Sequence, residues 1–406
     1  MTLPRAASHG GRALALVGVV LVAANLRTAV AALSPIYAEI RVDVAVDSIG
    51  VGLLGTLPPL CFAVFGLLAP VFRRVLRLES LVVVALLAIT AGHLLRGAST
   101  SFAMLALASI LTFAGMGVAN VTLPPIVKKY FPDRVGAITS LYATVMTLFA
   151  LMPPLVAVPV ADAFDWRIAV AIWAVFGLLA LAPWVTLWLR DRAPSVAVTD
   201  RDYDAPAVVL GRAWHSPLAW ALALLFGMTA INVFAVFAWL PEIVHDVAGV
   251  APAEAGALVS VYAAVGVPLS LVVPVLATRL RSVRPLIWIA AASYVVGYTG
   301  LLLAPGAAVW LWIVIAGIGP LTFPLVLVLI NLRTRTAEGS IALSGFTQGI
   351  GYLIGALGPL LVGVLHEASG GWTWPVVFLM ATVVFVVLGG LVVARPHVLE
   401  DDWHRR

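Results

Sequence analysis

Long apolar segments alternate along the chain with short clusters of charged residues. A helix needs roughly 20 apolar residues to cross the hydrocarbon core of a bilayer, and twelve segments of the sequence reach about that length. The pattern therefore predicts an all-α integral membrane protein with twelve transmembrane helices. The predicted spans cover residues 13–37, 48–72, 79–97, 101–127, 136–160, 167–189, 217–240, 254–277, 285–304, 307–330, 341–365 and 373–394.

Composition agrees with this reading. Hydrophobic residues make up 62% of the 406 positions, charged residues 11%, and the mean hydropathy is +1.08, so the lipid bilayer must solvate much of the apolar surface. The first segment is too long for a cleaved signal peptide and a second span follows at once, so we keep it in the fold. The single cysteine, Cys61, excludes an intramolecular disulfide.

Basic residues predict the orientation. The net charge of +5 comes from arginine-rich loops, which face a membrane surface. No basic face with interleaved aromatic residues suggests a nucleic-acid partner. With an even number of spans both termini share one side, and all lysines and arginines except Arg27, Arg41, Arg96 and Arg167 fall on it. The positive-inside rule therefore places both termini in the cytoplasm.

The chain divides into two similar parts. The polar stretch RDRAPSVAVTDRDYDAPAVVLGRAWHSP separates six spans from six, so we predict an N-terminal half at 1–190, a cytoplasmic linker at 191–216 and a C-terminal half at 217–406. LSPIYAEI after the first span matches WLPEIVHDV after the seventh. LPPIVKKYF and FPLVLVLINLR occupy corresponding places in spans four and ten. Pseudo-symmetric six-helix halves of this kind characterise the major facilitator superfamily, whose substrate site lies near the midplane between the halves.

Three motifs carry a closer resemblance. They are NLR at 25–27, LPPIVKKYFPDRVGAITSLYAT at 123–144 and LSGFTQGIGYLIGALGPLLVGVLHEASGGW at 343–372. The chain resembles the cyanate/nitroimidazole permease (CynX/NimT) branch of the superfamily. The resemblance implies a plasma-membrane permease for small molecules, with cyanate uptake and 2-nitroimidazole transport among the family's activities. The loop APVFRRVLRLES lacks the aspartate usual in the superfamily, which puts a gating ion pair centred on that aspartate in doubt.

Arg27 is the strongest candidate for substrate contact. It lies about 14 residues into the first span, roughly 20 Å from its start, and an intramembrane arginine usually faces a cavity or a partner. No Asp or Glu falls at the centre of any predicted span, so an anionic ligand is a natural counter-charge. The guanidinium offers forked donors suited to an oxyanion or a carboxylate. A structural ion pair or a helix-capping role is the alternative.

Other polar side chains recur at helical spacing. Ser344, Gln348 and Tyr352 form a polar stripe on one helix, which indicates either a substrate-lining face or hydrogen bonds between helices. Trp239 follows Asn232 by two turns, and is alternatively an interfacial belt residue. We interpret His93 as an interfacial histidine near the outer surface, close to Arg96. The predicted substrate-binding set is Arg27, Asn120, Tyr142, Asn232, Trp239, Gln348 and Tyr352.

Catalytic and nucleotide-driven functions find no support in the sequence. It lacks a GxGxxG at a strand–helix junction, a Walker loop and a Cys/His metal cluster, so we predict neither an enzyme nor an ATP-driven pump, and expect no catalytic residue, metal or cofactor. We predict a monomeric secondary active or facilitative transporter that moves a small, cyanate-like anion by alternating access. Facilitated diffusion, exchange and proton co-transport remain open. The alternative is an exporter of nitroimidazole-like or other small drugs, with a membrane receptor as a third, weaker reading.

Overall fold

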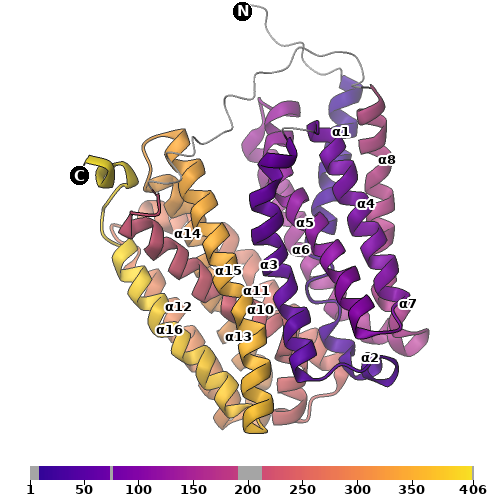
Figure 1. The fold of residues 1–406 in the computed structure, drawn as a ribbon. Coiled ribbons are helices and arrows are strands. Elements are labelled where there is room, and N and C mark those ends of the chain that lie inside the picture. Colours follow the sequence, from indigo (N-terminus) through magenta and orange to yellow (C-terminus); the bar gives the residue numbers. More distant parts are fainter. Residues whose placement is uncertain (1–8, 74–75, 191–212, 405–406) are drawn as a thin grey trace, which may run out of the picture.

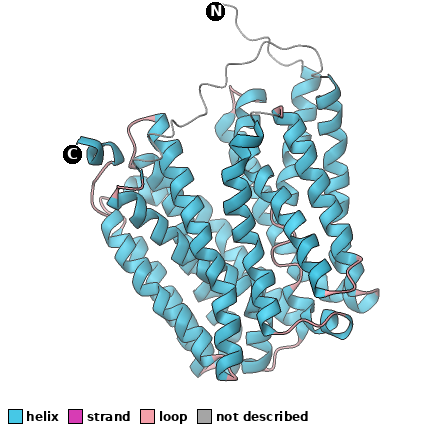
Figure 2. Ribbon diagram, in the orientation of Figure 1, coloured by secondary structure: helices cyan, strands magenta, loops and turns pink. Residues whose placement is uncertain are grey.

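The computed structural model describes residues 9–73, 76–190 and 213–404. All regular structure in these ranges is helical (Figure 2). Eleven of the described helical segments are long and apolar enough to cross a membrane, and a shorter apolar helix covers Gly11–Asn25. These segments correspond to the twelve predicted spans, so the predicted all-α fold class is confirmed.

The helices form two groups that stand side by side (Figure 1). We call the first group the N-half and the second the C-half. The N-half contains α1 (His9–Asn25), η1 (Ser34–Ile36), α2 (Tyr37–Asp43), α3 (Ser48–Arg73), α4 (Leu78–Gly97), α5 (Phe102–Tyr130), α6 (Val135–Ala163), α7 (Trp166–Ala171) and α8 (Ala174–Arg190). The C-half contains α10 (Pro217–Ala248), α11 (Pro252–Arg279), α12 (Arg284–Leu303), α13 (Pro305–Ile318), η3 (Gly319–Leu321), α14 (Thr322–Leu332), α15 (Ala337–Ser369), α16 (Thr373–Val393) and η4 (Leu399–His404).

Three predicted spans are interrupted rather than continuous. The tenth divides into α13 and α14 at η3, where Pro320 lacks the backbone N–H that a continuing helix needs. The sixth divides into α7 and α8. The first span ends as a helix at Asn25, and residues 26–33 form turns and bends before η1. No glycine or proline lies within 26–33, so the sequence carried no local signal for this break.

Both described ends of the chain lie at one end of the bundle, which we call the near end, and α2 marks the opposite, far end (Figure 1). The linker predicted at 191–216 falls mostly outside the described residues. On either side of it, α8 ends at Arg190 and α10 begins at Pro217, and the linker stays a prediction.

The two halves meet through the far-end parts of their helices. A Cβ built on Gly52 of α3 would lie 2.9 Å from the carbonyl oxygen of Pro359 in α15, so the two backbones touch. Ser260 of α11 donates a 2.8 Å hydrogen bond to the carbonyl of Leu151 in α6. Small residues permit this close approach of membrane helices.

One ion pair also joins the halves at this end: Arg41, at the end of α2, lies 2.7 Å from Glu242 of α10. Between described residues, no ion pair, hydrogen bond or ring contact joins the halves on the near side of the aromatic contact between Phe62 and Tyr352. The bundle is therefore sealed at the far end.

Candidate functional site

Arg27 lies in the unwound segment that follows α1, at the middle of the fold. The break leaves the last carbonyls of α1 at its end, and the negative end of a helix dipole favours a nearby cation. The side chain is half-buried, and its guanidinium carbon lies 5.5 Å from the centre of the Phe62 ring. Within the described ranges the Arg27 side chain forms no ion pair and no hydrogen bond. A cation–π contact is thus its one specific interaction, and its donors remain available.

Phe62 connects Arg27 to the C-half. Its ring contacts Tyr352 of α15 edge to face, with the ring centres 5.8 Å apart. Tyr352 also contacts Phe226 at 5.0 Å and Phe234 at 6.3 Å, both from α10. Its hydroxyl forms no hydrogen bond to any residue that the structure describes. The structure therefore brings Arg27 and Tyr352, two predicted residues from different halves, to either side of one aromatic ring.

Gln348 and Asn120 are the next predicted residues. Gln348 lies one helical turn before Tyr352 and is half-buried, and its amide nitrogen donates a 2.7 Å hydrogen bond to Ser344. The predicted polar stripe on α15 is therefore present, with two of its members bonded to each other. Asn120 of α5 is half-buried and forms no hydrogen bond with the described residues.

Tyr142 of α6 is half-buried and packs against the N-half core cluster that Tyr352 also touches. No specific contact joins it to Arg27 among the described residues. We keep Gln348, Asn120 and Tyr142 as polar groups around the site and assign the central contact to Arg27 and Tyr352.

Asn232 and Trp239 have other partners. The Asn232 amide nitrogen donates to Thr382 at 2.8 Å and to the Met228 carbonyl at 2.9 Å, and its oxygen accepts from Tyr298 at 2.9 Å. All of these groups lie in the C-half, and Asn232 is fully buried. The structure thus gives Asn232 the role of an interhelical hydrogen-bond centre.

Trp239 is fully buried and donates a 2.9 Å hydrogen bond to the carbonyl of Pro359. Its ring also packs at 5.5 Å against Trp372, so it is a core residue of the far end. The alternative that Trp239 belongs to an aromatic belt at the membrane interface is wrong, because its side chain is fully buried inside the protein.

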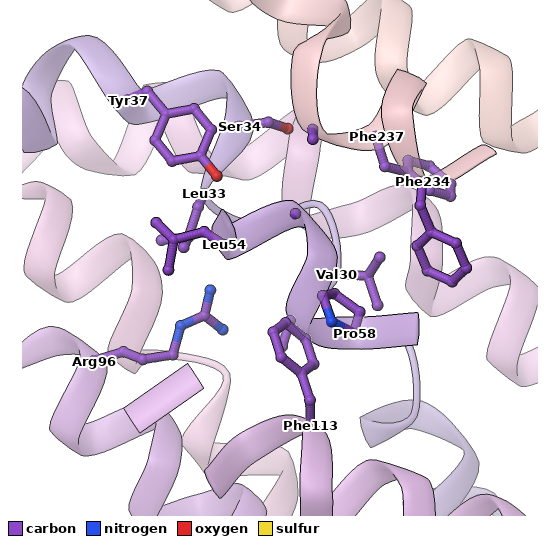
Figure 3. A pocket seen from close by; sticks show the side chains of 13 residues that line it. Val30, Leu33, Ser34, Tyr37, Leu54, Pro58, Arg96, Phe113, Phe234 and Phe237 are labelled. Carbon is purple, nitrogen blue, oxygen red and sulfur yellow. The ribbon is translucent and has the colours of Figure 1, made fainter. Parts of the chain in front are cut away.

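His93 and Arg96 do not lie at the outer surface, where the hydropathy pattern predicted them. Both side chains are completely buried in α4, and Arg96 lines a small cavity together with residues of both halves (Figure 3). A hydropathy pattern locates the end of a span but does not show which other helices cover its side chains. In the structure α7 packs against α4 at this end. Phe62 and Phe113 were also missed, since single aromatic residues in apolar spans carry no distinguishing pattern.

The chemistry available at this site is cationic and aromatic. Forked guanidinium donors, a phenol hydroxyl and aromatic faces can bind and orient a small planar or linear solute. No cluster of three metal-ligating side chains occurs among the described residues. The arrangement is suited to binding rather than to bond-breaking chemistry.

Comparison with known proteins identifies the family of this chain. Residues 16–356 match the model of the Major Facilitator Superfamily. The chain is 34% identical to the uncharacterized transporter YycB of Bacillus subtilis (strain 168), over 92% of this chain and 91% of that protein. It is 30% identical to the 2-nitroimidazole transporter of Escherichia coli (strain K12), over 97% and 99% of the two chains. Identity to the cyanate transport protein CynX of the same organism is 26%, over 87% and 90%.

Solved structures share the fold. A bacterial homolog of the human lysosomal transporter Spinster, in an inward-facing and unoccupied conformation, superposes with a TM-score of 0.73 at 16% identity, over 98% of this chain and 100% of that one. The resemblance to the cyanate/nitroimidazole permeases is confirmed, and so is the expectation that the protein is not an enzyme. The match to the family model and the matches to these relatives over most of their length show that the chain belongs to the major facilitator superfamily and is a multi-pass membrane transporter of small solutes.

Proposed function

We propose that this transporter moves a small anion of the cyanate class, and that Arg27 is its anchor. The observation that carries the proposal is the half-buried guanidinium of Arg27, which faces the meeting point of the halves without a carboxylate partner among the described residues. A cation held in a low-dielectric site without a counter-charge favours an anionic ligand. The relative named as a cyanate transport protein supports the substrate class.

We propose that the halves work by alternating access, and the way they meet supports this. We place the near end in the cytoplasm of a bacterial inner membrane, because nearly all basic residues outside the spans lie there. The far-end contacts, Arg41–Glu242 and Ser260–Leu151, would then seal the outer side. Halves divided at 1–190 and 217–406 would rock about the midplane and exchange this seal for one at the cytoplasmic side. We propose that a monomer suffices, since Arg27 and Tyr352 come from one chain.

Uptake of radiolabelled cyanate by proteoliposomes tests the proposal, with and without an imposed pH gradient. Wild type should accumulate cyanate, and Arg27→Gln should lose uptake by at least about tenfold, as expected when a charged hydrogen bond to substrate is removed. Arg395→Gln, which removes an exposed arginine at the near end, should retain wild-type uptake. Full cyanate uptake by Arg27→Gln would contradict the proposal. Dependence of uptake on the gradient would indicate proton coupling.

A second candidate function is export of nitroimidazole-like compounds. The aromatic residues Phe62, Phe226, Phe234 and Tyr352 present ring faces and edges around the site, and these stack well with a planar heterocycle. The 30% identical relative is named as a 2-nitroimidazole transporter. Cells that lack the protein should then accumulate more 2-nitroimidazole than wild type. Equal accumulation would remove this candidate.

A further inference from the structure

A second buried arginine faces a cavity between the halves, farther toward the far end than Arg27. Figure 3 shows the guanidinium of Arg96 and the hydroxyl of Tyr37 turned toward a common space, with Ser34 at its edge. Phe234, Phe237 and Ala238 of the C-half close the other side. The cavity measures about 10 Å³, which is close to the space of one water molecule.

Arg96 has no partner for its charge. Its side chain is 0% exposed, and neither Nε, Nη1 nor Nη2 forms a hydrogen bond. No ion pair with a carboxylate of the described residues involves it, and its one specific contact is with the Phe113 ring, whose centre lies 5.7 Å from the guanidinium carbon. The Ser34 hydroxyl is also buried without a hydrogen-bond partner. A buried cation and a buried donor around one cavity are unfavourable unless a ligand satisfies them.

Aromatic rings connect this cavity to Arg27. The guanidinium of Arg27 lies over Phe62, Phe62 contacts Phe113 edge to face at 6.5 Å, and Arg96 lies over Phe113. Ala29 and Val30, two and three residues beyond Arg27, line the cavity. The two guanidinium groups are thus linked through the Phe62 and Phe113 rings of the N-half.

We infer that Arg96, together with Ser34 and Tyr37, forms a second binding station for a small monovalent anion, on the far side of Arg27. In the state shown, the far-end contacts close the station around a water-sized space. When the halves rock and the far end opens, the cavity widens and an anion leaving Arg27 meets Arg96 before it reaches the outer solution. This inference deepens the proposed function and takes its anion class from it.

Bromide binding tests the station independently of transport. Thermal unfolding of the purified full-length protein is followed in detergent with rising bromide, starting from a halide-free buffer. Arg27→Gln should keep a saturable bromide-dependent rise in Tm, and Arg27→Gln/Arg96→Gln should lose it. Arg167→Gln, which removes an arginine already paired with Asp43 at 2.6 Å, should respond as wild type does. An identical bromide response in Arg27→Gln and the double variant would overturn the inference.

Transport separates this inference from the proposed function. Arg96→Gln should bind cyanate with an affinity within about twofold of wild type, because Arg27 remains, while its uptake falls at least about tenfold. Wild-type uptake by Arg96→Gln would overturn a station on the path. If Arg27→Gln instead retains full uptake, the proposed function fails, while a bromide response that depends on Arg96 would still establish an anion site there.

A purely structural role for Arg96 predicts a different result. If the guanidinium served only to pack on Phe113, Arg96→Met would lower the Tm and leave the bromide response intact, which would overturn the inference. If Arg96 is instead an anion station, the station is empty in halide-free buffer, and the buried charge of Arg96 is then not compensated. Arg96→Met should then keep or raise the Tm in that buffer and abolish the bromide response in the Arg27→Gln background.

Discussion

Two arginines without a carboxylate partner among the described residues, Arg27 and Arg96, distinguish the membrane interior of this protein. The buried amide of Asn232, by contrast, is hydrogen-bonded to Thr382 and Tyr298. The contrast between satisfied and unsatisfied polar groups is what separates structural residues from candidate ligands, since a buried polar group without a partner is costly. Residue type and spacing alone cannot make this distinction.

The role of Asn232 gives a prediction at this scale. Asn232→Ala leaves the Tyr298 hydroxyl without its 2.9 Å acceptor and Thr382 without its donor. We expect the free energy of unfolding to fall by about 1–2 kcal/mol, and KM for the transported substrate to stay unchanged. Denaturation in detergent and uptake kinetics measure the two effects. A raised KM with unchanged stability would instead return Asn232 to the substrate site.

Arg27 could be singled out from the sequence because a charge in an apolar span is conspicuous, and its contact with substrate stays a prediction. Sequence reasoning also selected Tyr352 and Gln348 from their helical spacing. It could not anticipate that Trp239 is a far-end core residue or that α7 covers Arg96, because periodicity gives the face of a helix and not the neighbour that this face meets. Phe62 and Phe113, which link the two arginines, became visible only through their ring contacts.

At the scale of the elements, the first span and the far-end seal matter most. The break after Asn25 places Arg27 on irregular backbone, as in transporters whose discontinuous helices form the substrate site. The following η1 packs against α10 and α11 of the C-half, so movement of the C-half acts directly on this segment. Hydropathy gave the twelve spans correctly but not this interruption, because residues 26–33 are as apolar as the helix before them.

Glycine packing at the seal yields a testable consequence. A Cβ on Gly55 of α3 would lie 2.7 Å from the Cβ atoms of both Ala238 and Pro359, so Gly55→Leu should hold the halves apart at the far end. Because alternating access requires this end to close, we expect uptake to fall by about tenfold or more. Gly306→Leu is the matched control, since nothing lies within 4 Å of an added Cβ there. Equal uptake by the two variants would contradict the role of the seal.

Another element-scale prediction concerns the link between α2 and α7. Asp43 accepts hydrogen bonds from Trp166 at 2.9 Å and Arg167 at 2.6 Å, and these lower the pKa of its carboxyl below the ordinary value of 3.8. The ionised form is therefore favoured by folding. Its contribution is present above the unfolded pKa and is lost as pH falls through the lower, folded pKa.

Asp43→Asn tests this linkage. The variant should be less stable than wild type at neutral pH, and the difference in Tm should shrink as the pH falls below the ordinary carboxyl value of 3.8. Trp166→Phe, which removes the hydrogen bond that lowers the Asp43 pKa most, should give an intermediate profile. A Tm difference between Asp43→Asn and wild type that does not vary with pH would contradict the assignment.

At the scale of the whole molecule, the two halves form a bundle whose helices are in contact at the far end. Arg27 and Arg96, the two arginines without a carboxylate partner among the described residues, lie near the surfaces where the halves face each other. Duplicated motifs in the sequence predict the two-part arrangement, and α8 and α10 end and begin at Arg190 and Pro217, on either side of the predicted linker. The sequence did not reveal which end is closed, because closure depends on the packing of Gly52, Gly55 and Pro359 between distant helices.

The measurement that tests the central claim most directly is equilibrium binding of radiolabelled cyanate to the purified protein. We predict saturable binding to wild type and a loss of affinity of about tenfold or more in Arg27→Gln, with a smaller loss in Arg27→Lys, which keeps the charge but not the forked donors. Equal affinity in wild type and Arg27→Gln would contradict the account, because the anion would then be bound without the guanidinium that is proposed to anchor it.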